Sequence, residues 1–512
     1  MTIVNRLGRQ WRLIAILVVG ICVRAFYLGQ CPQGLNQDET SLGYDAYSIL
    51  NYGMDRHLTP YPAFLIAWGS GMNVLSAYLA VPFIKVFGLT ALSLRLVNAI
   101  SGMVSLAIFY TFVRTISGER QALWSTFVLA ICPWHIMMSR WGLESNVLPA
   151  FFLTAVTCFI KAQERPRLWP LVGSLFGLCL YAYGTAYFAV PLFVTLGTLY
   201  MARRRTLNWR WFVAGVASFI LVSAPIVATV LINRLRLPST RMLGIGIPRM
   251  TTVPRYEQLS SLFGQDGLRR TWHNITALVT MILKQDDGAS WNNIPEFGIV
   301  YPIGLGFAAL GLLTLVQNTL RYRLASQEVW VVLWLLVALL LGVVQEANIN
   351  RVNLLWMPVV FLVAKGLNEA STDAWRARAF IAMMGAFFVA FCFSYFGPYR
   401  SASDGFFPGF GRALKVATAT VNGEVCVTDR VNMPYVFALF YDRTDPRKFA
   451  RTVVYEGEGE FQGVKSFDRF TFGISRCPPG TQAYVLERGE DEPLEATGTE
   501  IFRSSRYVVV KK

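Results

Sequence analysis

The chain has 512 residues, of which 54% are hydrophobic and only 15% are charged, and its formal net charge is +16. This composition is too apolar for a water-soluble fold of this length and indicates a polytopic α-helical membrane protein. In a soluble protein such a charge would suggest a nucleic-acid partner, but here the basic residues gather in short loops between apolar runs, where they orient membrane helices. We therefore expect no nucleic-acid binding.

The first predicted element is the apolar run 11–29, which follows basic residues as the core of a signal peptide does. The sequence after it, "QCPQGLNQDE", has no small-residue cleavage pattern, so we expect a retained membrane helix with a cytoplasmic N-terminus. Arg24 lies inside this run. A charge in the hydrocarbon region is costly unless it meets an anion or a carboxylate, so Arg24 is a candidate functional residue.

Apolar runs of about 17 to 25 residues can cross a bilayer as helices. Eleven runs meet this description or come close to it: 11–29, 93–113, 121–138, 146–161, 168–183, 185–201, 211–233, 299–317, 328–344, 352–368 and 379–397. A further run, 74–88, is ambiguous. If it does not cross, most loop arginines lie on the inner side and the short outer turns hold only Arg140 and Arg351. We therefore expect 74–88 to be a helix that lies on the outer membrane surface.

This topology predicts two domains. Residues 1–397 form a transmembrane domain with two large outer loops, 30–92 and 234–298, and residues 398–512 form an extracytoplasmic domain. The tail contains short alternating runs such as "GEVCVT", "TQAYVLE" and "SRYVVVKK", separated by Gly, Pro and Asp turns. These runs indicate a small α/β or β domain.

The eight cysteines show no CxxC or Cys/His cluster that would suggest a metal site. No nucleotide-binding glycine loop is evident either, so we expect no cofactor and leave metal dependence open. Cys426 and Cys477 share the polar tail and could form a disulfide in an oxidising compartment.

The stretch "GLNQDETSLGYDAY" places Asp38, Glu39 and Asp45 within eight residues, just after the first apolar run. One interpretation is that these acids are solvated, or that Asp38 caps a helix that begins here. The other is catalytic, because a carboxylate at the interface can take the proton from an acceptor hydroxyl as it attacks a sugar. Neighbouring like charges would raise one pKa toward the working range. The residues alone leave both interpretations open.

The stretch "LNQDETSLGYDAYSILNYGMDRHLTPYPAFLIAWGSG", with "VPFIKVFGLTALSLRLVNAISGMVSLAIFY" after it, resembles polyprenyl-phosphate-dependent glycosyltransferases of the GT-C fold. The family is glycosyltransferase family 39, which includes protein O-mannosyltransferases and lipid A aminoarabinose transferases. Its features are an Asp-Glu pair in the first outer loop, surface-lying helices and an S-x-R-L segment. Here they correspond to Asp38-Glu39, 74–88 and Ser93–Leu96.

The resemblance implies further site residues. In "CPWHIMMSRWGLESNVLPAFF", Arg140 and Glu144 would shape the donor or acceptor pocket, although Arg140 could also be a snorkelling interfacial residue. In "NINRVNLLWMPVV", Arg351 would bind the lipid phosphate, which a guanidinium fits with two hydrogen bonds. The family often carries an arginine at the position of Arg24 as well.

Three other residues are candidates for substrate contacts. Asp287 and Asn292 lie in "LKQDDGASWNNIPEFGIVYP" and could bind sugar or acceptor, although a plain acidic turn explains them equally well. Tyr183, in "YAYGTAYF", could line a lipid groove or belong to an aromatic belt. Relatives usually carry a Lys or His before the surface helix, where this chain has "WGSGMNVLSAYL" with no basic residue. His57, Arg56 and Arg351 are candidate replacements.

These features predict transfer of a sugar from a polyprenyl-phosphate carrier to a protein, lipid A or glycan acceptor on the outer side of the cytoplasmic membrane. The resemblance implies a single inverting displacement, with Asp38 as base, Glu39 supporting it, and Arg351, Arg24 and Arg140 stabilising the phosphate. A transporter or lipid flippase is the main alternative, and it would predict charged residues near mid-membrane in related halves. A polyprenyl-linked ligase or polymerase, or an inactive scaffold, stays open as well.

Overall fold

The computed structural model describes residues 3–254, 267–321, 327–402, 404–457, 461–490 and 498–512. Contacts between residues divide the chain into two compact units. The helical unit consists of Met1–Leu28, Asn98–Ala224 and Tyr256–Pro398, and the mixed unit of Gly29–Val97, Pro225–Arg255 and Tyr399–Lys512. Each unit is described below by itself.

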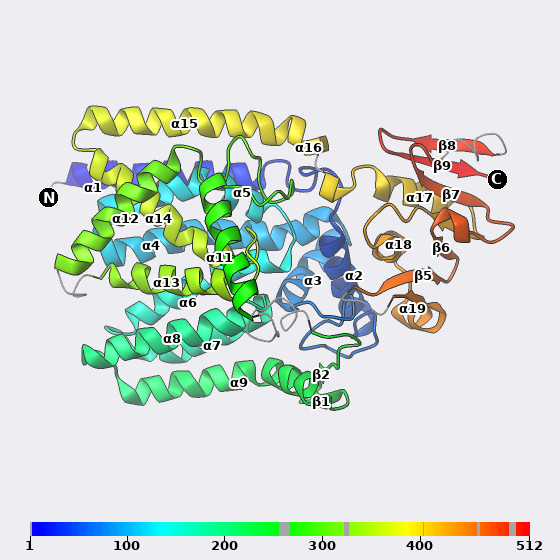
Figure 1. Ribbon diagram of the computed structural model, residues 1–512, viewed down its shortest axis with the longest axis horizontal. Coiled ribbons are helices and arrows are strands. Elements are labelled where there is room, and N and C mark those ends of the chain that lie inside the picture. Colours follow the sequence, from blue (N-terminus) through cyan, green and yellow to red (C-terminus); the bar gives the residue numbers. More distant parts are fainter. Residues whose placement is uncertain (1–2, 255–266, 322–326, 403, 458–460, 491–497) are drawn as a thin grey trace. The chain divides into compact units, whose positions relative to one another are not determined.

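Helices, most of them long and apolar, build the helical unit (Figure 1). They are α1 (Ile3–Ala25), α4 (Ala91–Ile131), α5 (Pro133–Ser139), α6 (Leu148–Lys161), α7 (Trp169–Ala182), α8 (Ala186–Arg203), α9 (Trp209–Arg234), α11 (Gly267–Lys284), α12 (Gly304–Arg321), α13 (Val329–Val344), α14 (Trp356–Ala370) and α15 (Ala374–Phe396). Short 3-10 turns precede three of them: η1 (Glu144–Val147), η2 (Pro166–Leu168) and η4 (Asn353–Leu355). The first residues of α4 and the last of α9 belong to the mixed unit.

All eleven predicted runs fall on helices, and the protein is a multi-pass membrane protein. Within the described residues, four helical segments are long and apolar enough to span a bilayer: Ala91–Ile131, Ala186–Arg203, Trp209–Arg234 and Ala374–Ser401. A fifth span results if Pro133–Ser139 and Glu144–Lys161, which meet at 117°, count as one. Eleven crossings therefore stay a prediction. The run 93–113 and the first part of 121–138 fall on α4, whose backbone breaks between them at Gly118 with a φ of 82°, and the end of 121–138 falls on α5.

Glycines allow α12 and α14 of the helical unit to pack closely. A Cβ on Gly311 of α12 would lie 2.0 Å from the carbonyl oxygen of Leu362, and one on Gly366 of α14 would lie 2.0 Å from that of Phe307. Within a bilayer, small residues of this kind let two backbones approach and gain dispersion contacts that larger side chains would prevent.

The mixed unit combines the first outer loop with the tail. It contains α2 (Gln37–Tyr52), α3 (Leu75–Phe87), the hairpin β1 (Thr240–Met242) and β2 (Ile245–Ile247), and the tail elements after residue 398. The run 74–88 is thus confirmed as a helix, and its place on the membrane surface stays a prediction. In the tail, the helices are α16 (Pro398–Ala402), α17 (Phe410–Thr420), α18 (Pro434–Asp442) and α19 (Pro446–Thr452), with 3-10 turns η5 (Asp404–Phe406) and η6 (Ile474–Arg476).

The tail carries a seven-stranded mixed sheet in the order β4-β5-β6-β3-β7-β9-β8 (Figure 1). Its strands are β3 (Val425–Val427), β4 (Val454–Glu456), β5 (Gly463–Phe467), β6 (Phe470–Phe472), β7 (Ala483–Glu487), β8 (Thr499–Arg503) and β9 (Tyr507–Lys511). The central strand β3 is parallel to both β6 and β7, and the remaining pairs are antiparallel. The α/β form of the predicted tail domain is the correct one, and the three quoted runs contain β3, β7 and β9.

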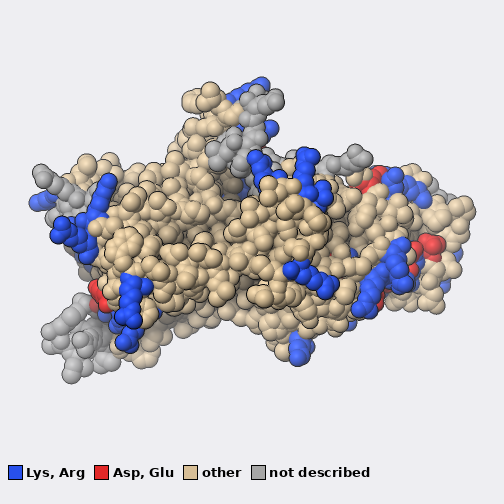
Figure 2. All heavy atoms as spheres, turned by 90° about the horizontal axis from the view of Figure 1, so that it is seen from below, with Lys and Arg blue, Asp and Glu red and all other residues tan. Residues whose placement is uncertain are grey.

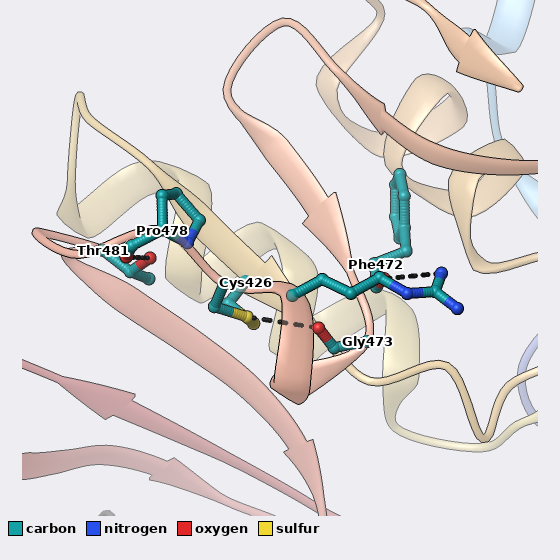
Figure 3. The surroundings of a disulfide bond; sticks show 7 residues. Cys426, Phe472, Gly473, Pro478 and Thr481 are labelled. Carbon is teal, nitrogen blue, oxygen red and sulfur yellow. Dashed lines mark hydrogen bonds between the residues drawn. A yellow bond between two sulfur atoms is a disulfide. The ribbon is translucent and has the colours of Figure 1, made fainter.

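A disulfide fastens β3 to the segment after β6 (Figure 3). It joins Cys426 and Cys477, whose Cα atoms are 5.8 Å apart, and so realises the pairing that the sequence left open. Cys426 is fully buried against Leu486, Val508 and Val510 of the neighbouring strands. The bond therefore ties the hydrophobic core of the sheet to its surface turn.

Candidate functional site

The Asp-Glu pair opens helix α2 in the mixed unit. Asn36 is the N-cap, because its side-chain oxygen accepts a hydrogen bond from the backbone N–H of Asp38 at 2.9 Å. In return, the backbone N–H of Asn36 donates to Oε2 of Glu39 at 3.1 Å, which completes a capping box. The expected helix start is therefore present, but Asn36 rather than Asp38 caps it.

Glu39 forms a buried ion pair with Arg95. The Arg95 guanidinium donates to both carboxylate oxygens, from Nε to Oε1 at 2.9 Å and from Nη2 to Oε2 at 3.1 Å. It also donates to the backbone oxygens of Pro32 and Gly34, at 2.7 and 2.8 Å. Both side chains are fully buried, so the pair fastens the entry of α2 to the first turns of α4. Glu39 thus has a clear structural function.

Asp38 differs from Glu39 in its exposure. Asp38 is partly exposed, whereas Glu39 is fully buried. The first turn of a helix carries a partial positive charge, which favours the ionised carboxylate. Of the two acids, Asp38 is therefore the more exposed.

A second buried ion pair joins Asp45 of α2 to Arg56 in the following loop. Nε and Nη2 of Arg56 donate to Oδ2 of Asp45 at 3.2 and 2.6 Å, and Nη2 also donates to the backbone oxygen of Ser41. Both side chains are at most 1% exposed. Because Asp45 already neutralises it, Arg56 is poorly suited to replace the missing basic residue of the family.

His57 lies beside this pair and is neutral at physiological pH. Its backbone N–H donates to Oδ1 of Asp55 at 2.9 Å, and its ring Nε2 is 3.1 Å from the backbone oxygen of Ala67. Since a carbonyl only accepts, Nε2 carries the proton. Burial, together with the positive charge of Arg56, lowers the pKa of His57 to about 4. His57 can therefore act as a hydrogen-bonding side chain but not as a cation.

The helical unit holds a second group of predicted residues, centred on Arg24. The Arg24 guanidinium donates to the backbone oxygens of Leu129 and Ala130, both at 3.0 Å, and lies 2.5 Å from Nδ1 of His135. Arg140 donates to the backbone oxygens of Val23 and Arg24 at 3.0 and 2.9 Å. These two carbonyls end α1, so Arg140 caps its C-terminus. Arg24 and Arg140 are both fully buried.

Two further predicted residues come together in the helical unit. Oδ2 of Asp287 accepts from Nδ2 of Asn292 at 2.6 Å and from the backbone N–H of Ile349 at 2.9 Å. Burial raises the pKa of Asp287 above its ordinary value. Asn292 in turn accepts a hydrogen bond from the side chain of Asn350. The predicted loop residues thus hold the turn that leads directly into Arg351.

Arg351 is the most accessible of the three predicted phosphate ligands. Its Nη1 pairs with Oε2 of Glu346 at 2.7 Å, and its side chain is 16% exposed. Glu144 opens η1 and is almost fully buried, and Tyr183 is the half-buried C-cap of α7. Within the described residues, no group of three or more His, Cys, Asp or Glu side chains could hold a metal ion.

Sequence reasoning missed three of the buried partners. Arg95 lies in the S-x-R-L segment that was recognised in the sequence. An arginine beside an apolar run is costly without an acidic partner, so this position was a detectable signal. His135 stood three residues after Cys132 in the second outer turn, beside apolar residues that gave no signal of an arginine contact. The pairing of Asp45 with Arg56 was detectable only as two opposite charges in the large first outer loop.

Residues 73–228 match the family model described as dolichyl-phosphate-mannose-protein mannosyltransferase. A comparison with curated proteins finds no match. Among solved structures, ArnT from Cupriavidus metallidurans bound to undecaprenyl phosphate has a TM-score of 0.58 at 12% identity, over 97% of this chain and 97% of that chain. The oligosaccharyltransferase AglB from Archaeoglobus fulgidus, in complex with an inhibitory peptide and a dolichol-phosphate, has a TM-score of 0.55 at 11% identity, over 96% of this chain and 70% of that chain. At these identities the likeness establishes the fold, and the predicted GT-C resemblance is confirmed.

Proposed function

We propose, from the match of residues 73–228 to the dolichyl-phosphate-mannose-protein mannosyltransferase family, that this chain transfers a sugar in the manner of that family. The protein is a membrane glycosyltransferase of the ArnT and protein mannosyltransferase type that depends on a polyprenyl-phosphate sugar. The acceptor would be a protein, lipid A or a glycan on the outer side of the cytoplasmic membrane. The undecaprenyl phosphate bound by ArnT and the dolichol-phosphate bound by AglB support a lipid-linked donor here.

The proposed reaction is a single inverting displacement. The acceptor hydroxyl attacks the anomeric carbon, the bond from that carbon to the phosphate oxygen breaks, and the polyprenyl phosphate leaves with the electron pair. The acceptor proton moves to the carboxylate of Asp38. The observation that carries this proposal is the contrast within the Asp-Glu pair, because Glu39 is engaged by Arg95 whereas Asp38 is partly exposed. Glu39 supports Asp38 by holding the first turn of α2 in place.

Stabilisation of the leaving phosphate is assigned to arginines of the helical unit. Arg351 is the principal candidate, since its guanidinium has five donors and Glu346 engages only part of them. Arg24 and Arg140 would add positive charge from buried positions, where a low dielectric strengthens electrostatic interactions. Glu144, Tyr183, Asp287, Asn292 and His57 are proposed as contacts of the sugar or the acceptor.

The test is transfer of a radiolabelled sugar from a panel of polyprenyl-phosphate donors in membranes with matched expression. We expect Asp38→Asn to lower the transfer rate by about 100-fold or more, as loss of a general base does, without lowering the melting temperature. Asp404→Asn is the control, because that tail carboxylate is 88% exposed. Full activity in Asp38→Asn would refute the assigned base. No transfer by the wild type from any donor would instead favour the transporter or flippase alternative.

A further inference from the structure

An apolar groove with a cavity volume of about 170 Å³ lies among α6, α7, α8 and α9 of the helical unit. Phe159, Phe176, Val194 and Phe212 are among its lining residues, and Thr195 carries the only hydroxyl of the lining. Glycines bring α7 and α9 close together beside it, because a Cβ on Gly173 would lie 1.9 Å from the carbonyl oxygen of Gly215. The groove can therefore hold a hydrocarbon chain but offers almost nothing to a polar ligand.

Two arginine-rich loops lie at one end of these helices. One joins α6 to α7 and the other joins α8 to α9, and Oγ1 of Thr206 donates to Oε1 of Gln163 at 3.2 Å, so the loops are side by side. Together they form the basic rim, which consists of Lys161, Arg165, Arg167, Arg203, Arg204, Arg205 and Arg210. All six arginines are exposed, and within the described part of the chain none of them forms an ion pair. Glu164 is the single acid in the two loops.

Such groups of basic side chains stand out on the protein surface. Figure 2 shows Lys and Arg gathered in patches on a surface that is otherwise mostly uncharged. Because the rim arginines have no carboxylate partners in the described chain, their charge is available to an anion from outside the protein.

The basic rim and the groove are continuous along the chain. Trp169 and Phe212 line the groove, and each follows a rim arginine, Arg167 or Arg210, by only two residues. Two residues span about 3 Å along a helix. Trp209, between the rim and the groove, is 62% exposed, as is typical of a tryptophan at the membrane–water interface. Since α8 and α9 are both candidate spans, the groove lies at the depth of lipid chains and the rim at the depth of headgroups.

We propose that the groove and the basic rim bind an anionic phospholipid, with one acyl chain in the groove and the phosphate on the rim arginines. A guanidinium fits a phosphate with two parallel hydrogen bonds, and basic pockets between membrane helices recognise anionic headgroups. A nucleic acid or an acidic protein would use the rim but leave the groove empty. A polyprenyl phosphate shares the chemistry of a phosphate with an apolar tail. Under the charge-based topology, however, the rim faces the cytoplasm, whereas the sugar transfer is proposed for the outer side.

The experiment is a lipid titration of the purified full-length protein, followed by native mass spectrometry. Dioleoyl phosphatidylglycerol, dioleoyl phosphatidylcholine and undecaprenyl phosphate are the three probes. We expect phosphatidylglycerol to bind more tightly than phosphatidylcholine and to resist displacement by undecaprenyl phosphate. Replacing Arg203, Arg204 and Arg205 by Gln should weaken phosphatidylglycerol roughly 100-fold, given about a factor of five for each basic residue near an anionic lipid. The same three residues changed to Lys should retain most of the affinity.

A second pair of variants tests the groove without changing the charge. Val194→Phe fills the groove and should also release phosphatidylglycerol. Val213→Phe is the matched control, because Val213 of α9 is 62% exposed and does not line the groove. Equal binding of the two phospholipids, unchanged affinity in the Gln variant, unchanged affinity in Val194→Phe, or displacement by undecaprenyl phosphate would each overturn the proposal. Because no sugar transfer is measured, the result does not depend on the proposed reaction.

Discussion

At the scale of single residues, the buried carboxylates of Asp45 and Asp55 differ in their partners. Asp45 pairs with Arg56. Oδ1 of Asp55 accepts only backbone bonds, from His57 at 2.9 Å and Thr59 at 2.8 Å, and its Oδ2 has no hydrogen-bond partner in the described structure. Burial is the main cause that raises the pKa of Asp55 to about 7.

This pKa predicts how stability changes with pH. A carboxyl group whose pKa is about 4 when unfolded and about 7 when folded stabilises the fold below pH 4, and that contribution is lost as the pH rises through 7. Asp55→Asn removes the ionisation but keeps the acceptor for the two backbone N–H groups. We expect the melting temperature of the variant to vary less between pH 5 and 8 and to exceed that of the wild type at pH 8. Parallel pH profiles of the two proteins would contradict the assignment.

The Glu39–Arg95 pair gives a second residue-scale prediction. Arg95→Ala leaves a buried carboxylate without its charged partner, which typically costs about 3 to 5 kcal/mol. The thermal midpoint of the purified protein should therefore fall sharply. Arg378→Ala, at an exposed arginine of α15, should leave it unchanged. A midpoint equal to that of the control would show that the pair contributes little stability.

Sequence patterns predicted the local part of these sites but not their distant partners. The helix start after Asn36 follows from nearest-neighbour chemistry, since N-caps and acidic first turns involve residues two to three positions apart. The partner of Glu39 lies 56 residues away in the chain, and no single sequence shows which arginine reaches it. The roles proposed for Asp38, Arg24, Arg140, Arg351 and the other site residues stay predictions.

At the scale of elements, the packing of α12 against α14 depends on Gly311 and Gly366. Gly366→Leu would force a side chain against the carbonyl of Phe307, so the helices must separate and lose their contacts. We expect a lower thermal midpoint and poorer expression. Gly385→Leu is the matched control, because a Cβ at this glycine of α15 meets nothing within 4 Å. Equal stability of the two variants would mean that α12 and α14 tolerate separation.

Helices, and the break inside α4, were predictable from the lengths of the apolar runs. The runs 146–161 and 168–183 correspond closely to η1 with α6 and to α7. Helix α4 covers most of two predicted runs, and its backbone breaks at Gly118, where polar residues interrupt the apolar pattern. The gap between the two runs therefore marked the break correctly.

At the scale of the whole molecule, the disulfide supports the predicted extracytoplasmic tail, because such bonds persist in oxidising compartments. We expect alkaline phosphatase fused after residue 512 to be active and the same enzyme inserted after Thr206, between α8 and α9, to be inactive. Alkaline phosphatase needs its own disulfides, so its activity reports the outer side of the membrane. The reverse pattern of activities would invert the proposed orientation.

The two-unit organisation lay beyond what the sequence predicted. The mixed unit joins Gly29–Val97 to the tail through contacts such as Nδ2 of Asn36 to the backbone oxygen of Gly405 at 2.8 Å and the Tyr44 hydroxyl to that of Thr444 at 2.5 Å. The residues in these contacts are roughly 370 to 400 positions apart in the chain, and amino-acid composition cannot predict such contacts. The division into a transmembrane domain, 1–397, and an extracytoplasmic domain, 398–512, therefore stays a prediction.

The mixed unit joins segments that are far apart in the chain, so translation limits the order in which it can fold. Strand β9, which lies between β7 and β8, occupies Tyr507–Lys511, more than 400 residues after the first outer loop. At about 5 to 20 residues per second, a ribosome that has completed residue 97 needs roughly 20 to 80 s to reach residue 512. During most of that interval the segment that carries Asp38 and Glu39 lacks its contacts with the tail, such as those with Gly405 and Thr444. The sheet of the mixed unit therefore cannot be completed before β9 has been translated.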